Sequence, residues 1–156
     1  MHSMRGAEAG AGREAGPEMK PIPKGAQGRY VHRVEPAHLA STFKDSILPP
    51  VFSTPYLILI MENAALNAIR QYLEDGESAV GTRVDVRHLV ATPVGREVVG
   101  HAEVVDVDGR RVFFRVWAMD GAEAIGVGIH ERSVVSISRI IEGMAVKYGG
   151  QREGAG

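Results

Sequence analysis

One apolar segment stands out from the rest of the chain. Residues 56–61 are apolar at every position, and no glycine or proline occurs from 56 to 73. Thr54 followed by Pro55 predicts a helix start, with the threonine hydroxyl as N-cap and proline as the first helical residue. The Asp-Gly pair at 75–76 predicts the end. Because a helix that is apolar on all sides is typically buried, we expect this helix in the core.

The other segments alternate with the period of a strand. Residues 28–34 alternate before the helix, and four long runs rich in Val, Ile, Thr and aromatics follow it, at 78–90, 97–107, 111–119 and 123–140. Asp-Gly pairs at 108–109 and 120–121 predict tight hairpins, and 92–95 predicts a further turn. One strand, one buried helix and a four-strand antiparallel meander are the α+β hot-dog fold, a long antiparallel sheet wrapped around one central helix.

Length and composition limit what this domain can be. The 156 residues fit a single domain, expected at 19–148, while the Gly- and Ala-rich leader 1–18 and the tail 149–156 are expected to be disordered. A formal net charge of -1 argues against a nucleic-acid partner. No run of residues is apolar enough to predict a membrane span. The absence of cysteine excludes disulfides and thiolate chemistry and is consistent with the cytoplasm, where we expect the protein.

Glu62 is the first candidate for chemistry, because it follows the apolar run directly. Carboxylates are rarely buried without a partner. One interpretation places Glu62 on a solvent-facing strip beside Asn63. The other places its carboxylate in a cleft as a base or nucleophile.

Thr54 and His88 are further candidates. The Thr54 hydroxyl has a structural role as N-cap, and the free N–H groups beside it could also stabilise an oxyanion. Alternation puts His88 on the less polar face of its strand, as a structural or a functional histidine. Arg132 belongs to a polar patch, 130–132, that consists of ordinary outward charges or of ligand contacts.

The sequence lacks the motifs of metal sites, serine hydrolases and phosphate-binding loops. The remaining histidines have no metal-like spacing with acidic residues, so we expect no metal site. No Gly-x-Ser-x-Gly elbow and no glycine-rich phosphate loop occurs, and no cofactor is expected.

Seven segments in register resemble the fluoroacetyl-CoA thioesterase family of hot-dog thioesterases: 51–54, 59–62, 72–77, 80–82, 86–93, 107–111 and 125–132. The resemblance implies that Thr54, Glu62 and His88 are catalytic, with Glu62 as nucleophile or base and the other two assisting. It also implies that Gly81 lines the acyl site and that Arg132 belongs to the same pocket. The family carries phenylalanines in a lid before this helix, whereas 44–50 has none. The expected substrate is therefore an acyl-CoA or related thioester of unspecified acyl group.

Two further expectations complete the sequence-based interpretation. Long edge strands are usually covered, so we expect a homodimer formed through the sheet. The alternative to a thioesterase is a non-catalytic hot-dog module that binds acyl-CoA or another small ligand, because a fold alone does not determine function.

Overall fold

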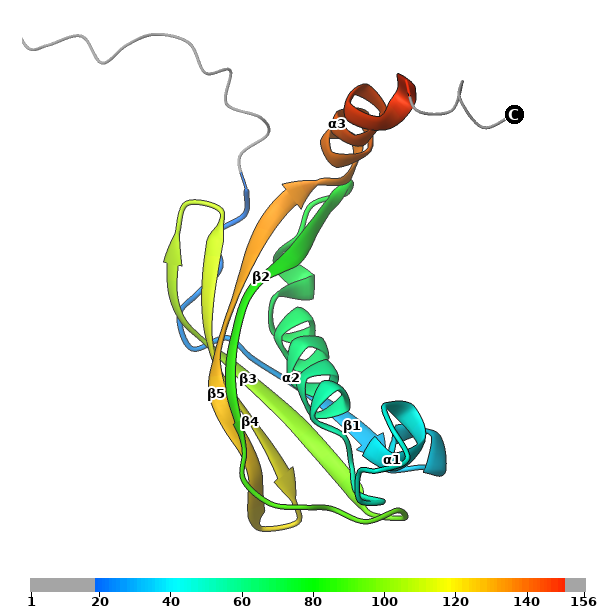
Figure 1. Ribbon diagram of the computed structural model, residues 1–156. Coiled ribbons are helices and arrows are strands. Elements are labelled where there is room, and N and C mark those ends of the chain that lie inside the picture. The colour runs from blue at the N-terminus through cyan, green and yellow to red at the C-terminus, as the bar shows by residue number, and fades with distance from the viewer. Residues whose placement is uncertain (1–18, 151–156) are drawn as a thin grey trace, which may run out of the picture.

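The computed structural model describes residues 19–150, so the predicted leader 1–18 and residues 151–156 of the predicted tail lie outside it. Helix α2 (Thr54–Ile69) lies along the concave face of one curved antiparallel sheet (Figure 1). The predicted α+β hot-dog fold is confirmed. The strands are β1 (Gln27–Arg33), β2 (Glu77–His88), β3 (Glu97–Asp108), β4 (Arg111–Asp120) and β5 (Glu123–Ser136).

The strand order corrects the predicted four-strand meander. The order is β1-β3-β4-β5-β2, so only β3, β4 and β5 form a meander, and β2 pairs with β5 at the edge. The predicted hairpin glycines, Gly109 and Gly121, both have positive φ angles. The turn at 92–95 instead leads from β2 across to β3, because both sides of β3 are occupied by β1 and β4.

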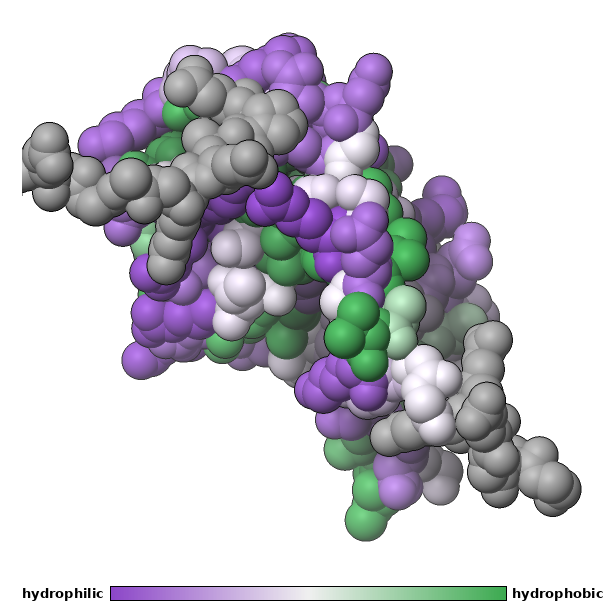
Figure 2. Space-filling model, turned by 90° about the horizontal axis from the view of Figure 1, so that it is seen from above, coloured by the Kyte–Doolittle hydropathy of each residue, from purple (hydrophilic) through white to green (hydrophobic). Residues whose placement is uncertain are grey.

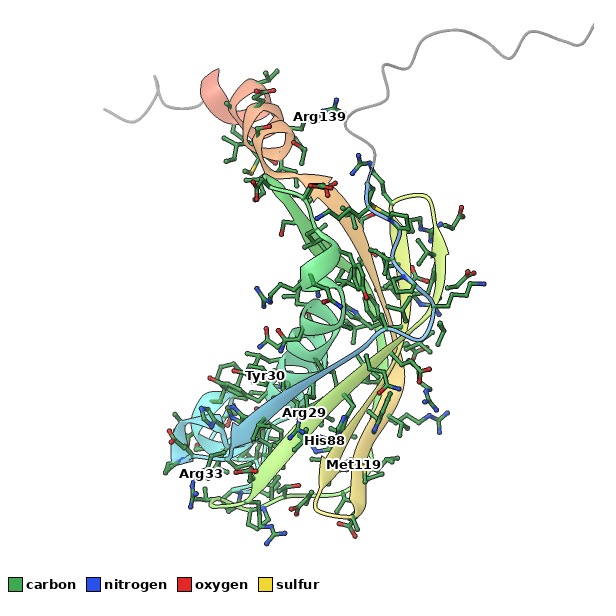
Figure 3. All side chains as sticks on the ribbon, turned by 180° about the vertical axis from the view of Figure 1, so that it is seen from behind. Arg29, Tyr30, Arg33, His88, Met119 and Arg139 are labelled. Atoms are coloured by element: carbon green, nitrogen blue, oxygen red, sulfur yellow. The ribbon has the colours of Figure 1, made fainter. Side chains whose placement is uncertain are left out.

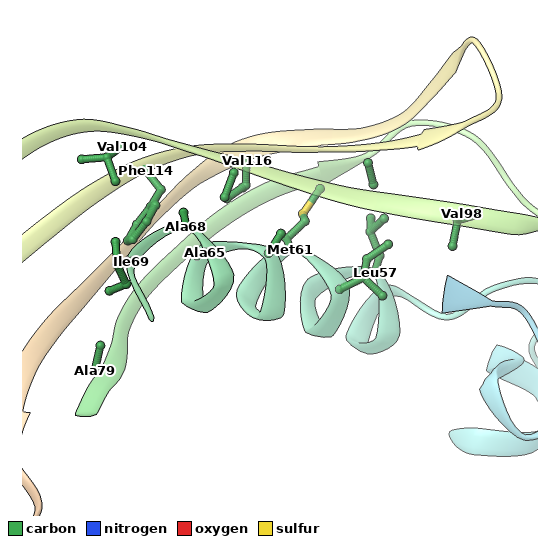
Figure 4. Close-up of a cluster of buried hydrophobic side chains, with 14 of the residues drawn as sticks. Leu57, Met61, Ala65, Ala68, Ile69, Ala79, Val98, Val104, Phe114 and Val116 are labelled. Carbon is green, nitrogen blue, oxygen red and sulfur yellow. The ribbon is translucent and has the colours of Figure 1, made fainter. Parts of the chain in front are cut away.

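The backbone of α2 touches the sheet directly at two glycines. A Cβ atom on Gly28 would lie 2.2 Å from the Ala64 carbonyl oxygen, and one on Gly100 would lie 2.3 Å from the Ile60 carbonyl oxygen. No other residue fits there without moving the helix. The close approach buries the inner face of α2 against the sheet (Figure 4). The buried residues of the helix are Leu57, Ile60, Met61, Ala64, Ala65, Ala68 and Ile69.

The ends of α2 differ from the prediction. Ser53 is the N-cap residue and Thr54 is already helical, so the predicted Thr54 cap is wrong. The Thr54 hydroxyl contacts another element, as described below. At the other end the α-helix stops at Ile69 and a 3-10 turn, η2 (Arg70–Tyr72), continues it. Leu59 remains 38% exposed, so the helix is not buried on every side.

Residues 137–140 were predicted as the end of the last strand and instead begin a helix. The expected strand 123–140 ends at Ser136, whose hydroxyl accepts a hydrogen bond from the Arg139 amide at 3.4 Å and caps α3 (Ile137–Tyr148). The paired strand β2 begins at Glu77, opposite Ser136, so no neighbouring strand remains to extend the ladder. The apolar side chains of α3 recur at helical spacing and stay exposed: Ile137, Ile140, Ile141, Met144 and Tyr148.

Helix α3 projects from one end of the sheet, away from α2 and the short helix α1 (Ala40–Phe43) (Figure 1). Figure 2 looks down on this end and shows hydrophobic residues at the surface among hydrophilic ones. Within residues 19–150, no helix is long and apolar enough to cross a membrane.

Candidate active site

Glu62 lies midway along α2 and is half-buried at the edge of the face that packs on the sheet. Its side chain is 38% exposed. It lines a pocket of about 520 Å³ together with Phe43, Pro55, Tyr56, Leu59, Asn63, Leu66 and Arg132. The position combines features of both sequence interpretations, because Glu62 lies beside Asn63 and both residues line this mostly apolar pocket, while the role of Glu62 as base or nucleophile stays a prediction.

Arg132 on β5 reaches the same carboxylate from the sheet. Its Nη1 donates to Glu62 Oε2 at 3.5 Å, while Nη2 and Nε donate to the Ala79 carbonyl at 2.7 and 3.3 Å. Burial lowers the pKa of the Arg132 guanidinium, and Glu62 acts in the opposite direction. Arg132 thus provides a buried positive charge beside the carboxylate.

Gly81 on β2 leaves room for this ion pair. A Cβ atom there would lie 3.3 Å from Glu62 Oε2 and 3.5 Å from Arg132 Nη1. Any side chain at this position would crowd the carboxylate. The structure therefore brings together Glu62, Arg132 and Gly81, three of the residues selected from sequence.

Thr54 and His88 form a separate pair at the N-terminus of α2. Thr54 Oγ1 lies 2.9 Å from His88 Nδ1. Burial lowers the pKa of His88 below its ordinary value of 6.5, and the nearby backbone of Val90 offsets only part of this. The ring is therefore neutral at pH 7. Its Nε2 is buried and has no hydrogen-bond partner within the described residues. Figure 3 shows His88 in the half of the sheet away from Arg139 on α3.

The two groups do not touch each other. Thr54 and Glu62 are eight residues apart on one helix, about 12 Å along its axis at 1.5 Å per residue. In the part of the chain that the structure describes, no hydrogen bond links the Thr54–His88 pair to Glu62. Of the five predicted residues, only Glu62 and Arg132 line the pocket. Neither Thr54 nor His88 lines it, although Pro55, next to Thr54, does.

The predicted alternation around His88 was only partly correct. The register of β2 against β5 shifts between Gly81 and Arg83, so Thr82 sits in an irregularity of the strand. Arg83, Val84 and Asp85 are all exposed, so this part of β2 has no buried face. From residue 85 to 90 the predicted alternation holds, and His88 is half-buried as expected, whereas its contact with Thr54 could not be read from β2.

Sequence analysis missed several residues of the site. Tyr56, Leu59, Asn63 and Leu66 line the pocket, and their helical spacing with Glu62 could have revealed them as one face. Phe43 gave no such signal, because α1 brings it to the pocket from a separate segment. Its ring meets Tyr56 edge-on at 5.0 Å between centroids.

Residues 19–150 contain no group of three or more His, Cys, Asp or Glu side chains that could hold a metal ion. The candidate residues supply a carboxylate, a guanidinium, an imidazole and a hydroxyl.

Comparisons with known proteins identify the family. The model of the family described as "FlK: Fluoroacetyl-CoA-specific thioesterase" matches residues 34–138, which is most of the described chain. The chain belongs to the fluoroacetyl-CoA-specific thioesterase family. The resemblance inferred from the seven segments is confirmed, and with it a thioesterase-like hydrolase of the hot-dog class.

Individual relatives agree with this assignment. The fluoroacetyl-CoA thioesterase of Streptantibioticus cattleyicolor is 44% identical over 91 residues, which are 58% of this chain and 66% of that protein. A solved structure of the fluoroacetyl-CoA thioesterase FlK shares 33% identity at a TM-score of 0.76, covering 81% of this chain and 98% of FlK. A hypothetical protein of Thermus thermophilus, a thioesterase superfamily member, shares 28% identity at a TM-score of 0.77, covering 88% of this chain and all of that one.

Proposed function

We propose that this fluoroacetyl-CoA thioesterase relative hydrolyses an acyl-CoA thioester to the free acid and CoA, with Glu62 as nucleophile or general base. The observation that carries the proposal is the position of Glu62, a carboxylate in the wall of a mostly apolar pocket. Its contact with Arg132 is a single one of 3.5 Å. A carboxylate that accepts one long hydrogen bond rather than two short ones has an oxygen lone pair available for reaction.

The chemistry needs one water molecule for each thioester. The Glu62 carboxylate attacks the thioester carbonyl carbon, or removes a proton from a water molecule that attacks it. The carbon–sulfur bond then breaks and the sulfur leaves with the electron pair, to be protonated as CoA. In the nucleophilic route, water hydrolyses the resulting anhydride and regenerates Glu62. In both routes the net reaction is thioester plus water giving acid plus thiol.

The Thr54–His88 pair is proposed to assist from the helix N-terminus, at a site that a second copy completes, because Thr54 and Glu62 of one chain lie about 12 Å apart along α2. The first N–H groups of α2 and the Thr54 hydroxyl are the donors that a developing oxyanion would require. Neutral His88 is proposed to orient that hydroxyl through the 2.9 Å contact and to carry a proton to or from it.

The volume of the pocket fits a small or medium acyl group but does not select one particular acyl group. This volume is about 520 Å³, and aromatic surface is added by Phe43, just ahead of the 44–50 segment, and by Tyr56, after it on α2. A relative, a point mutant of FlK, has been solved in complex with fluoroacetate and CoA, which supports CoA as the thiol carrier here. We propose that the enzyme hydrolyses acyl-CoA substrates without selectivity for the fluoroacetyl group. We also propose that it acts in the cytoplasm.

A panel of acyl-CoA substrates of increasing chain length, with a thiol-detecting reagent, tests the proposed function. We expect release of free CoA from at least the short members of the panel. Tight binding of an acyl-CoA without any CoA release would instead indicate the non-catalytic binding module.

The acidic limb of the pH profile should depend on His88. Since burial lowers its pKa below 6.5, the neutral ring predominates above that pH and the supported activity is lost as the pH falls through the lowered value. We expect His88→Ala to lower kcat and to flatten the acidic limb of a kcat/KM profile measured from pH 5 to 8. An unchanged profile in His88→Ala would remove His88 from the mechanism.

We propose that two copies pair through the outer edge of β2. Within residues 19–150 this strand pairs only with β5, and it presents Val80 and Val84, each 39% exposed. The opposite edge strand, β1, is less suited because Asn67 of α2 donates to its Arg29 carbonyl at 2.8 Å. An unpaired strand as long as β2 is a surface that proteins normally cover.

Sedimentation equilibrium at micromolar concentration tests the dimer. We expect a species of twice the 16.8 kDa chain mass. A Val80→Lys, Val84→Lys double variant should shift it to the monomer, because charge on a strand edge opposes pairing. Val31→Lys on β1, the matched control, should remain dimeric. A wild type that sediments as a monomer, or dissociation caused only by Val31→Lys, would contradict pairing through β2.

A further inference from the structure

His130 is a buried polar group to which no role has been assigned so far. Only 1% of its surface is exposed, and it lies on β5 with its ring stacked on Phe114 of β4 at 5.8 Å between centroids. A buried polar side chain has to be satisfied by hydrogen bonds. Both ring nitrogens of His130 therefore need hydrogen-bond partners inside the protein.

The two partners of His130 determine its tautomer. Nδ1 lies 2.8 Å from the Arg83 carbonyl oxygen, which can only accept, so Nδ1 carries the proton. Nε2 lies 3.0 Å from Arg132 Nη1, which can only donate, so Nε2 is the acceptor. His130 thus links the backbone of β2 to the guanidinium of Arg132.

The charge state of His130 agrees with this geometry. Burial lowers its pKa below 6.5. The Arg83 carbonyl and the carboxylates of Glu62 and Glu131 raise the pKa, while Arg132 lowers it further. The ring is therefore neutral at pH 7 and has a lone pair available for Arg132.

We propose that His130 is a positioning residue that limits Arg132 to a single hydrogen bond with Glu62. Nε and Nη2 of Arg132 are directed to the Ala79 carbonyl, and one Nη1 hydrogen is taken by His130. One Nη1 hydrogen then remains for Glu62, and the second Nη2 hydrogen makes no hydrogen bond within the described residues. Without the His130 acceptor the guanidinium is free to rotate toward a bidentate pair, which would occupy both carboxylate oxygens and weaken Glu62 as a nucleophile or base.

Two variants separate the two hydrogen bonds of His130, and this test rests on the proposed function. His130→Asn places an amide near the Nδ1 position, so it keeps the donor to Arg83 and loses the acceptor for Arg132. His130→Gln reaches the Nε2 position, so its carbonyl oxygen keeps the acceptor. Both variants lose the ring stacked on Phe114. We expect kcat for acyl-CoA hydrolysis to fall about tenfold or more in His130→Asn and to recover most of the wild-type value in His130→Gln.

Equal losses in the two variants, or no loss in either, would overturn the inference, because a purely structural ring would affect both alike. The wild type provides a test that needs no variant. Nitrogen-15 spectra of histidine-labelled protein at pH 7 should show His130 protonated at Nδ1, and protonation at Nε2 would overturn the inference by itself. A wild type that releases no CoA from any acyl-CoA refutes the proposed function instead, and the positioning role with it.

Discussion

Glu62→Gln should lower turnover on the acyl-CoA panel by about two orders of magnitude or more. Glutamine preserves the size of the side chain and can still accept from Arg132 Nη1, but it lacks the negative charge that a base or nucleophile needs. The measurement is kcat for each acyl-CoA in the thiol-release assay. The free energy of unfolding should change little, since burying an amide costs no more than burying a carboxylate.

The matched control for this variant is Glu123→Gln, the same chemical change at an exposed position at the start of β5. It should leave kcat and KM at the wild-type values. Near-wild-type hydrolysis by Glu62→Gln across the panel would contradict the proposed mechanism. A comparable loss in the control would instead indicate a general effect of removing surface charge.

Gly100→Ala should destabilise the domain by about 3 kcal/mol, a large share of the stability of a domain this size. The new methyl group would lie 2.3 Å from the Ile60 carbonyl oxygen, so α2 and β3 would have to separate. Denaturant unfolding, followed by far-ultraviolet circular dichroism, measures the loss. Activity per folded molecule should fall too, because α2 carries both Thr54 and Glu62.

Gly143→Ala on α3 provides the control for this substitution. It adds the same methyl group in open space, with no atom within 4 Å of the new Cβ. Alanine favours a helix interior over glycine by about 1 kcal/mol, so the variant should be as stable as the wild type or slightly more. Equal stability of Gly100→Ala and the wild type would show that the helix backbone does not press on β3.

The confirmed sequence predictions concern local features and long motifs. The apolar run at 56–61 indicated the central helix, and the Asp-Gly pairs at 108–109 and 120–121 indicated both hairpins. These signals act between neighbouring residues, so they are readable without knowing the fold. The seven motif segments likewise identified the family that the comparisons confirm.

Contacts between distant segments could not be predicted in the same way. The neighbour of β2 depends on which strands occupy the other edges, and that competition placed β2 beside β5 rather than β3. The run after Ser136 suits both strand and helix, and it became α3 because β2 provides no partner beyond Glu77. Local propensity gives way to tertiary context in both cases.

The site shows the same division. Sequence alone selected Glu62, Thr54, His88, Gly81 and Arg132 as candidates, through the lone carboxylate and the family motifs. Only the tertiary structure decided that they form two groups, that Phe43 reaches the pocket and that His130 contacts Arg132. The physical reason is that hydrogen-bond geometry depends on where separate elements of the fold meet, whereas sequence patterns report only on each element by itself.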